Sequence, residues 1–169
     1  CTKIYNPNGV ARGREKKSMP QSLSMVYIHA VFSTKNRIPC IMPSEFQHEV
    51  WAYISGISTR LGCPILCIGG MSDHMHVLFR IGREINQADW VMEVKRSLSV
   101  WVKTKWPERS DFYWQNGYGM FSVSPSSLDD VRDYIHNQET HHQKMDFKTE
   151  FRCLLKKHGL EWDERYVWE

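Results

Sequence analysis

The order of strand-like and helix-like segments along the chain most constrains its fold. Runs rich in β-branched and aromatic residues predict four strands, at residues 25–32, 64–69, 73–79 and 120–123. Apolar residues at helical spacing predict a helix at 44–61 and another at 86–106. The order strand–helix–strand–strand–helix–strand is that of the ferredoxin-like split βαβ unit. We therefore predict an α+β domain with one four-stranded antiparallel sheet, two helices on one face, and central first and third strands.

Two more helices are predicted after the fourth strand. The first begins near Ser127, where Ser127-x-x-Asp130 resembles a capping box, and it continues through Gln138. The second spans about 147–158 and ends at Gly159. We expect the histidine-bearing third strand to lie mid-sheet, with its histidines on whichever face carries the added C-terminal helix.

Length and composition predict a single soluble domain. The 169 residues include 41% hydrophobic and 24% charged residues, which is ordinary for a globular protein. No apolar run approaches the roughly 20 residues that cross a membrane, and five cysteines without a disulfide pattern are typical of the cytoplasm. Residues 1–18 carry five basic residues against one acidic, which predicts a flexible basic arm before a domain at 19–169. We interpret the arm as added by cloning or translated from an upstream frame, with a functional basic tail as the alternative.

The third predicted strand carries His74 and His76 in the sequence Asp73-His-Met-His-Val-Leu-Phe79. Side chains alternate between the two faces of a strand, so both histidines point the same way. Two imidazoles on one face form half of a metal site, although surface or core histidines at this spacing are also common. His29 in the first strand can share this face, but we expect it to have a hydrogen-bonded or core role.

Tyr134 and Gln138 can supply the rest of a reaction centre. Their i, i+4 spacing puts them on one side of a helix, and packing over the histidine strand would bring all four side chains together. Two imidazoles and an amide oxygen suit Mg²⁺ or Mn²⁺ with phosphate oxygens completing the shell. A tyrosine beside such an ion can attack a phosphodiester and form a covalent phosphotyrosine. This exchange needs no nucleotide hydrolysis, consistent with the absence of a phosphate-binding P-loop motif.

Four motifs in this order resemble the HUH-type, single-tyrosine transposases of the insertion-sequence-200-like family. The resemblance runs from about Met19 to Trp168 and includes the segments His29-Ala-Val-Phe-Ser-Thr-Lys-Asn-Arg37, Ser72-Asp-His-Met-His-Val-Leu-Phe79, Trp114-Gln-Asn-Gly-Tyr-Gly119 and Tyr134-Ile-His-Asn-Gln-Glu-Thr-His-His142. It implies a ferredoxin-like enzyme, usually a homodimer, that cuts and rejoins single-stranded DNA with hairpin ends.

The same resemblance implies roles for individual residues. His74, His76 and Gln138 correspond to metal ligands, and Tyr134 to the nucleophile that becomes linked to the 5′ phosphate. Candidate DNA contacts lie in three segments: the loop at 33–43, the predicted helix at 86–106 and the aromatic, glycine-rich segment at 112–119. They are Lys35, Arg37, Lys95, Arg96, Trp114 and Tyr118. Solvation of the charged residues and burial of the aromatic ones are the structural alternatives.

Three other interpretations remain open at this point. Cys63 and Cys67 could join His74 and His76 in a zinc site, although zinc would give Tyr134 no role. The domain could bind nucleic acid without chemistry, by stacking bases on sheet aromatics. A domesticated relative could apply the same chemistry to chromosomal hairpin repeats.

Overall fold

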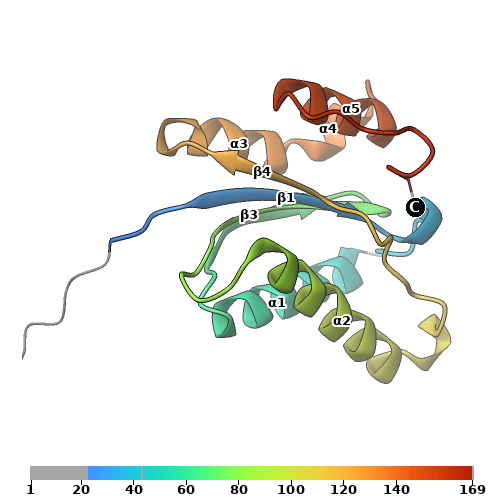
Figure 1. Cartoon of the computed structure of the whole chain (residues 1–169). Coiled ribbons are helices and arrows are strands. Elements are labelled where there is room, and N and C mark those ends of the chain that lie inside the picture. Colours follow the sequence, from blue (N-terminus) through green and yellow to red (C-terminus); the bar gives the residue numbers. More distant parts are fainter. Residues whose placement is uncertain (1–22, 43, 169) are drawn as a thin grey trace, which may run out of the picture.

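A computed structural model describes residues 23–42 and 44–168, so the predicted basic arm at 1–18 lies outside the described residues. Its single sheet has the strand order β2-β3-β1-β4, and every neighbouring pair is antiparallel (Figure 1). The strands are β1 (Tyr27–Ser33), β2 (Ile65–Gly70), β3 (His74–Arg80) and β4 (Gly119–Val123). The predicted ferredoxin-like sheet, with its first and third strands in the centre, is confirmed.

Helices cover both faces of this sheet (Figure 1). One face carries α1 (Ser44–Arg60) and α2 (Gln87–Lys105), the two helices of the split βαβ unit. The other face carries the C-terminal helices α3 (Leu128–His136), α4 (Gln138–His142) and α5 (Phe147–Lys157). Short 3-10 helices lie at Lys35–Arg37, Pro107–Arg109 and Pro125–Ser127. No helix in the described ranges is long and apolar enough to cross a membrane.

Alternation along the two central strands separates the core from the polar face. In β3, Met75, Val77 and Phe79 point into the main hydrophobic core beneath α1 and α2. The residues between them, His74 and His76, point to the opposite face, under the C-terminal helices. The face with the histidines therefore has two small apolar clusters beside its polar centre.

The predicted single helix from Ser127 through Gln138 is wrong in two respects. The chain leaves helical geometry at Asn137 (φ −93°, ψ 20°), which ends α3 and precedes α4. No side-chain cap forms at Ser127, because its hydroxyl lies 3.1 Å from the hydroxyl of Ser124 in the preceding 3-10 turn. The side-chain amide of Asn137 donates to the carbonyl of Asp133 (2.8 Å), which also accepts the backbone N–H of Asn137 (3.0 Å) at the end of α3.

Two glycines let the C-terminal helices approach the sheet closely. A Cβ atom on Gly69 would lie 2.6 Å from the carbonyl oxygen of Ile135, the residue after Tyr134. A Cβ atom on Gly119 would lie 2.7 Å from the ring of Phe151, the residue after Glu150. Each glycine therefore lets the backbone of α3 or α5 lie close enough to the sheet for a polar side chain of that helix to reach the histidine face.

We expect Gly69→Ala to destabilise the protein by about 1–3 kcal/mol, because the backbone of α3 must move to admit the methyl group. Gly56→Ala in α1 is the matched control, since a Cβ atom there meets nothing within 4 Å. That change should stabilise the helix by up to about 1 kcal/mol. Chemical denaturation of both variants measures the difference, and equal effects would show that the approach at Gly69 is not tight.

Candidate active site

The two histidines of β3 are completely buried at the centre of the sheet, with exposed fractions of 1% for His74 and 0% for His76. Nδ1 of His74 donates to Oδ1 of Asp73 (2.7 Å), so its Nε2 carries the lone pair. Nδ1 of His76 shares a hydrogen bond of 3.0 Å with Nε2 of His29, which confirms the hydrogen-bonded role expected for His29. Both Nε2 atoms are buried without a hydrogen-bond partner. Such pairs of oriented, unpartnered nitrogens are suited to bind a metal ion.

Burial favours the neutral form of two of these imidazoles, His29 and His76. It lowers the pKa of His29 to about 3, with His76 adding a smaller effect in the same direction. Burial also lowers the pKa of His76 from its ordinary value, although Glu150 opposes the shift. Neutral imidazoles retain the lone pair that a metal ligand needs.

Tyr134 and Gln138 reach the histidines from α3 and α4 of the same chain. The ring of Tyr134 stands edge-on to that of His76, with 5.7 Å between centroids. Gln138 is buried, and its Oε1 atom has no hydrogen-bond partner. The break at Asn137 does not separate the two side chains, because Nε2 of Gln138 still lies 3.4 Å from the carbonyl of Tyr134. The structure thus brings together all four residues predicted from the sequence.

Glu150 of α5 occupies the centre of the site and was missed by the sequence analysis. It is 2% exposed, and its Oε1 accepts hydrogen bonds from the hydroxyl of Tyr134 and from Nε2 of Gln138, the latter at 3.0 Å. The sequence did contain a signal, because Glu150 interrupts the apolar stripe that Phe147, Phe151 and Leu154 form on the same helix. A carboxylate in such a stripe is buried and needs a partner.

Two more histidines surround the same carboxylate. Nε2 of His142 lies 3.0 Å from Oε2 of Glu150, and Nε2 of His141 lies 3.6 Å from Oε1. The donor atoms of His74, His142 and Glu150 all lie within 4.8 Å of one another. Among the described residues this is the group of His, Cys, Asp and Glu side chains that could hold an ion. It shares His74 with the predicted ligands and does not include His76.

Hydrogen bonds favour the ionised form of Glu150. Burial would raise the pKa of this carboxyl, but hydrogen bonds from His76, Tyr134 and Gln138 hold it well below its ordinary value. Burial and the neighbouring carboxylate raise the pKa of Tyr134, so its hydroxyl remains protonated. A buried, ionised carboxylate at the centre of this cluster favours a bound cation.

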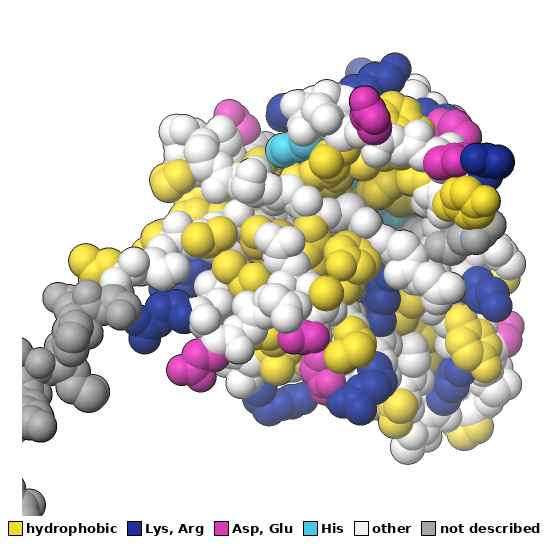
Figure 2. All heavy atoms as spheres, viewed as in Figure 1, with side chains coloured by type: hydrophobic (Ala, Val, Ile, Leu, Met, Phe, Trp, Pro, Cys, Tyr) yellow, Lys and Arg dark blue, Asp and Glu magenta, His cyan; other side chains and the backbone are white. Residues whose placement is uncertain are grey.

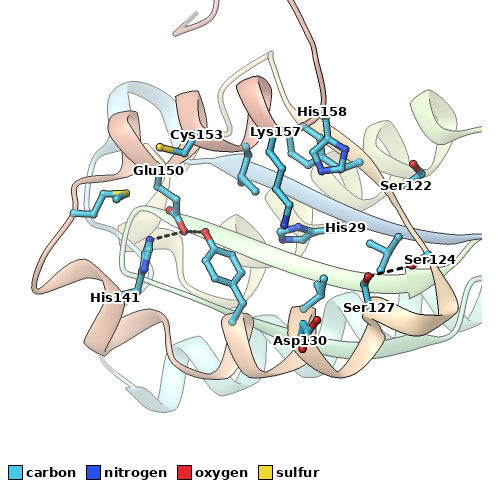
Figure 3. A pocket seen from close by; sticks show the side chains of 16 residues that line it. His29, Ser122, Ser124, Ser127, Asp130, His141, Glu150, Cys153, Lys157 and His158 are labelled. Carbon is cyan, nitrogen blue, oxygen red and sulfur yellow. Dashed lines mark hydrogen bonds and ion pairs between the residues drawn. The ribbon is translucent and has the colours of Figure 1, made fainter.

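A cavity of about 650 Å³ opens beside Tyr134 and Glu150 (Figure 3). Phe121 and Leu154 form part of its apolar wall, and Lys157 and His158 reach into it from α5 over His29. Figure 2 shows histidine side chains at the surface between the α3–α5 layer and the sheet, among hydrophobic side chains. Tyr134 therefore lies at a cavity large enough for a sizeable ligand, with a partly apolar lining that includes Lys157.

The candidate DNA contacts on α2 and in the aromatic segment do not gather at this site. The ammonium of Lys95 donates to the carbonyls of Gln115 (2.7 Å) and Gly117 (2.8 Å), and burial lowers its pKa to about 8. Arg96 pairs with Glu93 at 2.5 Å on the α1/α2 side of the sheet. Trp114 is only 8% exposed and belongs to the main core, as the structural alternative expected.

The other three candidate contacts are at least partly accessible. Lys35 is exposed, with its ammonium 5.8 Å from the ring centroid of Tyr113, and Tyr118 is 41% exposed. Arg37 is half-buried and helps to line a hollow of about 300 Å³ beside Asp73, the residue that orients His74. Arg37 and Tyr118 each line a hollow together with Phe147, whose ring stacks on His74.

The zinc alternative finds no support in the described residues. Cys63 lies in the main core beneath α1 and α2, and its sulfur accepts a hydrogen bond from the backbone of Gly82 (3.1 Å). Cys67 lies on the opposite face, beside Leu78 and Ile135. The potential metal group contains no cysteine, because the two thiols belong to different layers of the molecule.

Comparison with known proteins agrees with this geometry. The family model of IS200-like transposases matches residues 22–138. No curated protein sequence is significantly similar to the chain. A Deinococcus radiodurans R1 protein, described provisionally as a transposase, has a similar structure with a TM-score of 0.58 and 20% identity, over 72% of this chain and 97% of the other.

A REP-associated tyrosine transposase bound to a REP hairpin is also similar in structure, with a TM-score of 0.55 and 13% identity, over 76% of this chain and 74% of the other. At these identities the two structures show a shared fold. The family match covers the sheet, α1, α2 and the helix that carries Tyr134. The chain therefore belongs to the IS200-like transposase family.

Proposed function

We propose that this protein cuts and rejoins single-stranded DNA, with Tyr134 as the nucleophile and a divalent metal ion at the histidine pair. One observation carries the proposal. The hydroxyl of Tyr134 and the Nε2 atoms of His74 and His76 converge on the buried carboxylate of Glu150, beside an open cavity. A domain that only bound nucleic acid would have no use for this arrangement.

The residues of the site fit a divalent ion. His74, His76 and Gln138 would hold it, since each presents a buried donor atom without a hydrogen-bond partner. Mg²⁺ and Mn²⁺ are the predicted ions, and such an ion would polarise the phosphodiester and stabilise charge on its oxygens. Asp73 and His29 orient the ligands, because each bonds the second nitrogen of one ring.

The proposed reaction conserves the number of phosphodiester bonds. The phenolic oxygen of Tyr134 attacks phosphorus, a bond from tyrosine to the 5′ phosphate forms, and the bond to the 3′ oxygen breaks. The tyrosine proton has an acceptor at hand in Glu150, and the departing 3′ oxygen takes a proton from water. Attack by a 3′ hydroxyl on the phosphotyrosine reverses these changes and rejoins the strand.

The cavity beside Tyr134 offers a path for the DNA strand. Phe121 and Leu154 provide apolar surface for a base, and Lys157 provides a positive charge for a phosphate. The hairpin bound by the REP-associated relative supports hairpin-bearing DNA as the substrate. One chain supplies both Tyr134 and the histidines, so the predicted homodimer is not needed to assemble this site.

We expect Asp73→Ala to lower the affinity for Mn²⁺ by about 10–100-fold, because Asp73 fixes the tautomer and orientation of His74. Titration calorimetry of the purified protein without DNA measures this affinity. Asp111→Ala, at an exposed position, is the control and should bind Mn²⁺ like the wild type. Equal affinities in both variants would show that Asp73 does not position a metal ligand.

Tyr134→Phe should retain DNA binding and abolish covalent attachment, because only the nucleophilic oxygen is removed. Denaturing gels of the protein incubated with single-stranded hairpin DNA and Mn²⁺ detect the adduct, and mobility shifts measure binding. Loss of binding by a folded variant would assign Tyr134 to recognition instead. Persistence of the adduct would assign the nucleophile to another residue.

Lys157→Glu should weaken binding of single-stranded hairpin DNA about 5–30-fold, equivalent to about 1–2 kcal/mol for the lost phosphate contact and the new repulsion. Lys156→Glu is a matched control, because it changes the net charge equally at the neighbouring position outside the cavity. Fluorescence anisotropy at one fixed salt concentration compares the two. Equal losses would mean that overall charge, and not the cavity, governs binding.

A further inference from the structure

The segment that follows Gln138 adds two metal-binding side chains to the site. The family match ends at residue 138, whereas His142 and Glu150 come later and still lie against the histidine face. We propose that Glu150 and His142 bind the metal ion together with the histidine pair. This inference rests on the proposed function for the presence of an ion and deepens it by assigning the ligands and the preferred metal.

The separations between donor atoms fit one shared ion. Ligand atoms about 2.1 Å from an ion lie roughly 3.0–3.4 Å apart in octahedral or tetrahedral geometry. Oε2 of Glu150 lies 3.0 Å from Nε2 of His142 and 3.7 Å from Nε2 of His74. These two distances bracket the required range, so small side-chain adjustments would place an ion between the three atoms.

The two oxygens of Glu150 have different neighbours. Oε1 accepts the hydrogen bonds from Tyr134 and Gln138, while Oε2 faces His74 and His142. Glu150 can therefore bind an ion through Oε2 and keep the tyrosine hydroxyl on Oε1. The hydrogen bond between His142 and Oε2 would be exchanged for two bonds to the ion, with the imidazole proton moving to Nδ1.

The buried charge of Glu150 has no permanent cation. In the described part of the chain, every ion-pair partner of this carboxylate is a histidine. None of these described partners is a lysine or an arginine. A buried carboxylate without such a partner is costly, and a divalent ion would offset that cost.

Helix α5 holds Glu150 in place by packing on both sides of it. The ring of Phe147 stacks on His74, with centroids 4.4 Å apart, and Phe151 fills the space above Gly119. Asp146 caps the helix by accepting a hydrogen bond from the backbone of Thr149 (2.8 Å). The carboxylate is thus fixed by the fold and is not a mobile surface group.

A site with several imidazoles and one carboxylate favours Mn²⁺ over Mg²⁺. Mg²⁺ prefers oxygen ligands and retains its water, whereas Mn²⁺ accepts imidazole nitrogen more readily. With His142 and Glu150 included, the protein alone supplies enough ligands to bind Mn²⁺ without DNA. The ligands from His74 and His76 alone would leave most of the shell to phosphate oxygens.

Titration calorimetry of the full chain with MnCl₂ and MgCl₂, without DNA, tests this inference. We expect the wild type to bind Mn²⁺ at least about tenfold more tightly than Mg²⁺. Glu150→Gln and His142→Ala should each lower the Mn²⁺ affinity at least about tenfold. Glu139→Gln, at an exposed position on α4, should leave it unchanged. Circular dichroism in EDTA checks that each variant folds, and His142→Ala provides a second test should Glu150→Gln fail to fold.

Pulsed electron paramagnetic resonance of the Mn²⁺-loaded protein separates direct ligation from an indirect effect. The imidazole nitrogen signal should decrease in His142→Ala, because one nitrogen ligand is lost, and should keep its intensity in Glu150→Gln at saturating Mn²⁺. Wild-type Mn²⁺ affinity in both variants would overturn the inference, as would the absence of Mn²⁺ binding by the wild type. Suppose that Glu150→Gln and His142→Ala both bind Mn²⁺ like the wild type, while His74→Ala loses Mn²⁺ binding. The proposed function would then stand, and only the added ligands would be rejected.

Discussion

The buried carboxylate of Glu150 is the interaction on which the site depends. It is anionic, 2% exposed, and in contact with side chains from β3, α3 and α4. Removing a carboxylate from water is unfavourable unless hydrogen bonds and opposite charge compensate it. The hydroxyl of Tyr134, the amide of Gln138 and the surrounding imidazoles supply the hydrogen bonds, and a divalent ion would supply the charge. The same contacts hold Tyr134 against the histidine pair.

The sheet fixes the positions of the side chains that surround Glu150. Alternation along β3 places the apolar residues in the main core and the histidines on the opposite face. Gly69 and Gly119 then let α3 and α5 lie low enough for their polar side chains to reach that face. Strand alternation and two glycines are therefore enough to position the polar cluster on the histidine face. The helices α1 and α2 stabilise the sheet by packing on its opposite face.

Much of the fold and part of the site could be predicted from the sequence. The order of strands and helices identified the ferredoxin-like sheet, and the spacing of His74 and His76 identified their shared face. Tyr134 and Gln138 followed from helical spacing, although the helix breaks at Asn137 because the turn around that residue satisfies the end of α3 locally. These features depend on neighbours in the sequence, which is why pattern reasoning found them.

Glu150, His142 and Lys157 depend on how α4 and α5 dock, and no local pattern determines that docking. Lys95 and Trp114 were candidates for DNA contact because of their chemistry, yet one binds loop carbonyls and the other fills the core. A basic or aromatic side chain thus acquires its role from tertiary packing. Glu150 was detectable only as a charged residue in an apolar helical stripe.

The most direct test of the account is to identify the chemical bond between protein and DNA. The protein would be incubated with single-stranded hairpin DNA and Mn²⁺, digested with protease, and the nucleotide-bearing peptide sequenced by mass spectrometry. The account predicts a 5′-phosphate ester on Tyr134 and a released DNA fragment ending in a 3′ hydroxyl. A cleaved strand with a free 5′ phosphate and no peptide adduct, or an adduct on another residue, would contradict it.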